Sequence, residues 1–123
     1  MKNLIILSSL IFLVPGLLQA DESLISTSPD DAKVYFIQPE DGAVVSGEVD
    51  VVFGLIGMGV APAGVNVENT GHHHLLINLD ELPDMSKPLP ANENVKHFGK
   101  GQTQVRLALP PGEHTLQLLL GNY

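Results

Sequence analysis

The sequence predicts an all-β fold, an immunoglobulin-like sandwich of short antiparallel strands. Several short segments alternate apolar and polar residues with the two-residue period of a strand. Glycine and proline residues, which favour turns, separate these segments from one another. No helical period of 3.6 residues persists after the first twenty residues, which favours two packed sheets over a mixed fold.

Five segments carry the strand pattern, namely residues 34–38, 48–55, 72–79, 103–109 and 114–120. The first is rich in β-branched and aromatic residues and ends at Pro39, where a turn begins. Residues 57–71 contain four glycines and a proline, which argues against a regular element. Residues 80–102 contain three prolines. We therefore expect both segments to be long loops on either side of the third strand.

The N-terminus has the pattern of a secretory signal peptide, predicted over residues 1–20. A basic start is followed by the apolar helical stretch 4–18, and Leu18-Gln19-Ala20 suits cleavage after Ala20. Since this stretch is shorter than the roughly 20 residues of a membrane span, an uncleaved anchor is only the alternative. Polar residues 21–33 predict a disordered leader, and residues 34–123 the folded domain. We expect the protein in the periplasm or outside the cell.

Composition excludes several classes of function. The chain has a formal net charge of −8 at pH 7, and removal of Lys2 with the signal peptide makes it more negative. Nucleic acids and anionic membranes select for basic surfaces, so neither is an expected partner. Because cysteine is absent, the domain has no disulfide and no thiolate chemistry. Because tryptophan is absent, a sugar site of stacked indoles is excluded.

Three consecutive histidines open the third predicted strand. His73 is in phase with Leu75 and Ile77, so we expect it to face the core. His72 and His74 share the other face, with roughly 6.5–7 Å between their α-carbons. Two neutral imidazoles held on one strand suit a transition metal, copper before zinc. The alternative for this pair is a polar solvent face, or hydrogen bonds to the glycine-rich loop.

His97 is the predicted third metal ligand, because both long loops flank the histidine strand and His97 lies in the second. Its alternative is an ordinary surface histidine. A ligating imidazole needs an acceptor for its other ring nitrogen, which Asn69, Asn78 or a loop carbonyl would provide.

His114 and the acidic residues have simpler interpretations. His114 follows a Pro-Gly turn, and we expect its ring to bond back to that loop, as the tyrosine of a tyrosine corner does. Asp80, Glu81 and Asp84 are expected to form a solvated surface. No nucleophile, zinc-protease or phosphate-loop motif occurs, so we do not expect an enzyme.

Four motifs resemble the bacterial exported family labelled domain of unknown function 4399 (DUF4399). In chain order they are Gly57-Met58-Gly59-Val60-Ala61-Pro62-Ala63-Gly64, Thr70-Gly71-His72-His73-His74-Leu75-Leu76-Ile77, His97-Phe98-Gly99 with Gly101-Gln102-Thr103, and residues 109–118. The resemblance implies a small secreted β domain of undetermined biochemistry. Members continue with a histidine- and proline-rich turn and a closing strand, so we expect this domain to lack its C-terminal strand and any ligands from that segment.

Two functions therefore stand as hypotheses. The first is an exported, non-catalytic domain that binds copper or zinc through His72, His74 and His97. The second is a structural or interaction module that contacts another envelope protein, with histidines that only organise the loops.

Overall fold

The structure, a computed structural model, describes residues 26–122, and all regular structure in this range is β. The predicted signal peptide and the start of the leader lie outside the described residues. The strands are β1 (Lys33–Gln38), β2 (Glu48–Ile56), β3 (Gly59–Val60), β4 (Thr70–Ile77), β5 (Val95–His97), β6 (Gln104–Ala108) and β7 (Leu116–Gly121). Among the described residues, no helix has the length and apolar character needed to cross a membrane.

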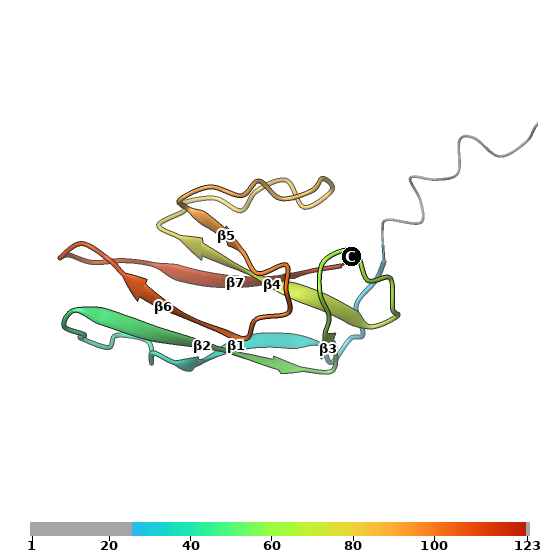
Figure 1. Cartoon of the computed structure of the whole chain (residues 1–123), viewed down its shortest axis with the longest axis horizontal. Helices are drawn as coiled ribbons and strands as arrows, with labels where there is room; N and C mark the ends of the chain where they lie inside the picture. Colours follow the sequence, from blue (N-terminus) through green and yellow to red (C-terminus); the bar gives the residue numbers. More distant parts are fainter. Residues whose placement is uncertain (1–25, 123) are drawn as a thin grey trace, which may run out of the picture.

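The strands form two sheets that lie in two layers (Figure 1). One sheet has the order β1-β2-β6, and all its pairings are antiparallel. The other is built around β4, which pairs antiparallel with β5 and β7 and parallel with β3. Because His74 is paired with both His97 and Leu119, β5 and β7 lie on opposite edges of β4. The predicted all-β sandwich is confirmed.

The core lies between the sheets and is made by residues of alternating strand positions. Val49, Val51 and Phe53 of β2 face across to β4, as their alternation predicted. The other buried members of this cluster are Leu75, Ile77, Phe98, Leu107 and Leu118. Each buried aliphatic or aromatic side chain of this size stabilises the fold by about 1.5–3 kcal/mol relative to exposure. This core fixes the faces of β4, on which the histidines lie.

The five predicted strands are present, but two short strands were missed. β3 and β5 lie in the segments expected to be loops, and that expectation was wrong there. A strand of two or three residues is too short to show a period, because its stability comes from backbone hydrogen bonds. In β3, for example, Gly59 N donates to Asn69 O at 2.9 Å, and Ala61 N then donates to Gly71 O at 2.8 Å.

Backbone hydrogen bonds form near both ends of the predicted domain. Residues 26–32 precede β1 and contain a turn in which Ala32 N donates to Pro29 O at 3.0 Å. At the other end, β7 pairs with β4 from Leu116 to Gly121, so this strand has a partner within the sandwich. The domain limits and the further closing strand stay predictions.

Candidate metal centre

His73 lies on the core side of β4, as predicted. Its side chain is 0% exposed, and its ring centroid lies 5.0 Å from that of Phe53 at a tilt of 48°. However, neither ring nitrogen of His73 has a hydrogen-bond partner among the described residues. His73 therefore lies where the two-residue period predicted. His73 packs as if it were a hydrophobic residue.

His72 and His74 lie on the opposite face of β4 and are also buried. Their relative exposures are 5% and 4%, which rules out the alternative of a polar solvent face. The two ring centroids are 4.8 Å apart and the rings are tilted by 47°. The spacing follows from the strand, since residues two apart project from the same face. The pair is therefore held together in a protected environment.

His97 joins this pair from the neighbouring strand. It is paired with His74 in the antiparallel register of β4 and β5, and directly opposed residues project from the same face. Its ring centroid lies 4.8 Å from that of His72 and 5.0 Å from that of His74. His97 is exposed, unlike the other two. The structure thus brings together the three residues that the sequence predicted as metal ligands.

The three rings have nearly the spacing of a metal site. One nitrogen from each of the three rings can be chosen so that all lie within 4.8 Å of one another. Nitrogens bound to one tetrahedral ion at 2.0–2.1 Å lie about 3.4 Å apart. The rings must therefore move closer together for all three nitrogens to bind one ion. Within residues 26–122 this group contains no carboxylate ligand.

Burial keeps the inner rings uncharged. It lowers the pKa of His74 to about 4, and the neighbouring His72 and His97 lower it further. Burial also lowers the pKa of His72, with a second contribution from His97. The pKa of His73 is lowered by burial and by His72. Neutral imidazole is the form that binds a metal ion, so His72 and His74 are ready to ligate at pH 7.

The inner rings also have unused hydrogen-bonding atoms. Nδ1 of His72 and Nδ1 of His74 are buried without a partner in the described part of the chain. Asn78, one of the three candidate acceptors, leaves the strand at a φ of 55° and bonds elsewhere. The carbonyl of Asn69 accepts from Gly59. The predicted hydrogen-bonding support for the ligands is therefore not formed by these residues.

His114 has the structural role that its position predicted. Its Nε2–H donates to Pro110 O at 2.6 Å, which is the expected bond back to the loop, and its Nδ1 accepts from Asn78 Nδ2 at 2.9 Å. Asn78 Oδ1 in turn accepts from Thr115 N at 2.9 Å. This network explains why β7 begins at Leu116 rather than at His114. Asp80, Glu81 and Asp84 are exposed, as expected of a solvated surface.

Two glycines beside the rings were missed by the sequence analysis. Gly121 is paired with His72 across β4 and β7, and a side chain there would contact the His74 ring. A side chain on Gly99 would contact the His97 ring. A signal was present, because a glycine at the end of an apolar strand often marks a close approach by another group.

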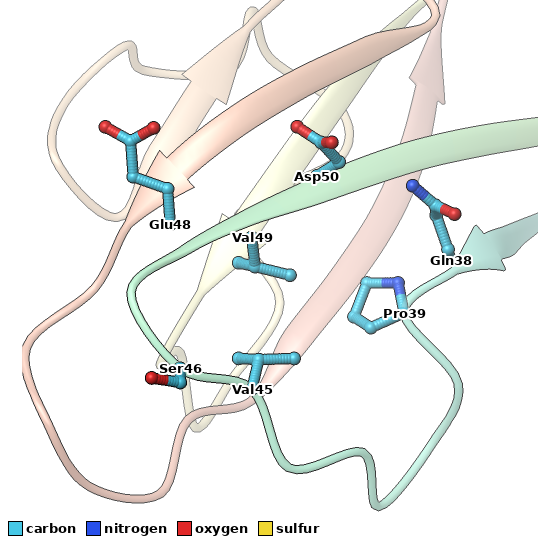
Figure 2. A pocket seen from close by; sticks show the side chains of 7 residues that line it. All are labelled: Gln38, Pro39, Val45, Ser46, Glu48, Val49 and Asp50. Carbon is cyan, nitrogen blue, oxygen red and sulfur yellow. The ribbon is translucent and has the colours of Figure 1, made fainter.

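A surface hollow lies elsewhere, between the end of β1 and the start of β2 (Figure 2). It is lined by Gln38, Pro39, Val45, Ser46, Glu48, Val49 and Asp50. It contains no histidine, and Arg106 neutralises Asp50 through a contact of 2.7 Å between Nε and Oδ1. The chemistry of the histidine cluster is therefore separate from this hollow.

Residues 51–123 match a family described as Domain of unknown function (DUF4399). The matched region covers β3, β4, β5, β6 and β7, and so all three clustered histidines. Comparison of the chain with curated proteins and with solved structures gave no match.

Proposed function

The chain belongs to the DUF4399 family, and we propose that it binds one transition-metal ion through His72, His74 and His97. The observation that carries this proposal is the pair of buried, unpaired Nδ1 atoms on two rings that contact a third imidazole. Leaving a buried polar atom unpaired costs about 1–3 kcal/mol. Coordination of an ion would draw the ring nitrogens into bonds and recover part of this cost.

Copper is the first candidate and zinc the second. Neutral imidazole suits both, and for a given set of nitrogen ligands the divalent copper ion binds more tightly than zinc. The chain has no cysteine to select for softer ions. Its net charge of −8 would attract any cation.

The proposed role is capture or handling of the ion rather than catalysis. Three protein ligands leave at least one coordination position for water or another ligand. His97 is exposed whereas His72 and His74 are buried, so an ion would enter and leave at the His97 side. The proposal includes export to the periplasm or the cell exterior and no insertion into the membrane after signal cleavage. The N-terminal pattern of residues 1–20 supports it.

The experiment is a calorimetric titration of the protein with Cu(II), Cu(I) and Zn(II) at pH 7. We expect one ion per chain and a dissociation constant below about 1 µM, well beyond that of scattered surface histidines. His97→Ala should weaken binding, whereas His114→Ala should not, because His114 bonds Pro110 and Asn78. Binding no tighter than about 0.1 mM for all three ions would refute the proposal.

A second candidate function is a protein-interaction module of the cell envelope. Exposed apolar side chains on and beyond β1 favour it: Ile37 is 56% exposed and Val44 is 99% exposed. Val45, which follows Val44 in the chain, is 53% exposed and lines the hollow in Figure 2. Replacing Val44 and Val45 with Ser should then abolish binding to an envelope partner and leave metal binding unchanged. A pull-down from an envelope extract compares partner binding by the wild type with partner binding by the variant.

A further inference from the structure

We infer that Gly121 and Gly99 are positioning residues of the histidine cluster, which keep the rings of His74 and His97 in place by having no side chain of their own. This role in metal binding rests on the function proposed above. Gly121 belongs to β7 and Gly99 follows β5, so each approaches the cluster from a different edge of β4.

Because Gly121 has no side chain, the His74 ring can lie close to its backbone. It is paired with His72, so a side chain at this position would project from the same face as both inner histidines. A Cβ on Gly121 would lie 2.8 Å from Cε1 and 3.3 Å from Nδ1 of His74, and 3.8 Å from Cε1 of His72. The first of these distances is too short for any real contact, so the His74 ring would have to move.

The absence of a side chain on Gly99 likewise leaves room for the His97 ring. Its position is two residues beyond His97, and a Cβ there would overlap Cε1 of the ring and lie 3.1 Å from Nδ1. The Cβ of Ala63 would be 3.3 Å away on the other side. Gly99 O accepts a hydrogen bond of 2.9 Å from Ala63 N, which holds this segment against the glycine-rich loop. Because this backbone is held, a new side chain on Gly99 would displace the His97 ring.

The backbone does not require glycine at either position. Positive φ angles occur at Gly42, Gly47, Gly57, Gly64, Gly101 and Gly112, and neither Gly99 nor Gly121 is among them. Alanine would fit the backbone of both residues, so space for the imidazole rings is the physical reason for glycine. Gly59 is a matched control, because it lies on a strand, as Gly121 does, has no positive φ, and a Cβ there would make an ordinary 3.5 Å contact with Thr70.

The test compares Gly121→Ala and Gly99→Ala with Gly59→Ala in a Zn(II) titration. We expect each of the first two to weaken binding about 10-fold or more, as is typical when groups that orient ligands are changed, and the third to leave it unchanged. The thermal midpoint of metal-free Gly121→Ala should fall, because the buried His74 ring must move to admit the new methyl group. In a His74→Ala background, Gly121→Ala should cause no further loss of affinity, since the ring on which it acts is gone.

Two results would overturn this role. If wild type binds Zn(II) and Gly121→Ala binds it equally well, Gly121 does not position His74, and the metal site itself stands. If wild type binds no metal, the proposed function fails, and the metal-free protein decides the positioning role. In that case the ring resonances of His72 and His74 should move in Gly121→Ala while those of His114 do not, and unchanged resonances would refute the role.

Discussion

The two faces of β4 use the same side chain in opposite ways. On the core face, His73 is a single imidazole among apolar residues, next to Phe53 and between the sheets. On the other face, His72 and His74 lie beside each other and beside His97. All three residues of the triplet are almost fully buried, so burial does not distinguish the faces.

The difference between the faces is the neighbouring group. Within residues 26–122, both ring nitrogens of His73 are unpaired, and its aromatic partner Phe53 offers no ligand atom. His72 and His74 also have unpaired Nδ1 atoms, but further ring nitrogens lie within metal-binding reach. On the core face, the free-energy cost of unpaired nitrogens remains. On the other face, binding of a metal ion would recover part of this cost.

The largest expected effect is the loss of metal binding when the outer face is changed. His72→Ala combined with His74→Ala removes two of three ligands and should weaken binding about 1,000-fold or more, equivalent to about 4 kcal/mol. The fold should remain, because both side chains project from the face of β4 opposite His73 and the core between the sheets. Calorimetry measures the affinity, and circular dichroism checks the fold. Retained affinity in the double variant would show that the ion binds elsewhere.

The core face should respond in stability rather than in metal affinity. His73→Ala leaves a cavity beside Phe53 and should destabilise the metal-free protein by about 3 kcal/mol. His73→Leu fills most of that space and removes two unpaired nitrogens, so it should be neutral or stabilising by about 1 kcal/mol. Urea unfolding of both variants measures this contrast. Equal destabilisation by the two substitutions would show that the nitrogens of His73 have partners.

Protonation of His74, on the outer face, should make the stability of the fold depend on pH. The folded pKa of His74 is about 4, below its usual value of 6.5, so the unfolded chain binds a proton first as pH falls. Stability from this group is complete above about pH 6.5 and is lost between there and pH 4, by on the order of 2–3 kcal/mol. The comparison is with His74→Gln, which cannot titrate. Parallel stability curves for the two proteins over this range would contradict the low pKa.

The lowered pKa also changes the expected pH range of metal binding. From the reference pKa alone, binding should weaken below about pH 6. Because burial depresses the pKa of His72 and His74, these two ligands should resist protonation to lower pH. A titration of Zn(II) affinity against pH, with free imidazole as the reference, checks this shift.

The smallest expected effect concerns the histidine outside both faces. His114→Ala removes the bonds to Pro110 and Asn78 at an exposed junction and should cost about 1 kcal/mol. Metal affinity should not change. A His114→Ala protein with weakened Zn(II) binding would show that this junction supports the cluster.

Much of this arrangement is predictable from residue patterns. The two-residue period placed His73 inward and His72 with His74 outward, and both placements are found. We expected His97 near the pair because it lies in the long segment that follows the histidine strand. In the structure it lies on β5 opposite His74. The bond from His114 to its loop followed from the Pro-Gly turn before it.

Other features depend on contacts between distant segments and leave no local pattern. The burial of His72 and His74 on the outer face was not predicted, because alternation gives direction but not what covers a face. The space left by Gly121 depends on the register of β7 against β4, which sequence alternation does not fix. Asn78 was one of three candidates to assist the histidines, yet it has a left-handed conformation and bonds His114.

Metal binding by the three clustered histidines is tested most directly by identifying which histidine rings shift their nitrogen-15 signals when Zn(II) is added. The chain has five histidines, and nitrogen-15 spectra of their rings report each one before and after addition of the ion. We expect coordination shifts at His72, His74 and His97, and none at His73 or His114. Coordination at His73 or His114, or no coordination at the clustered three, would contradict this expectation.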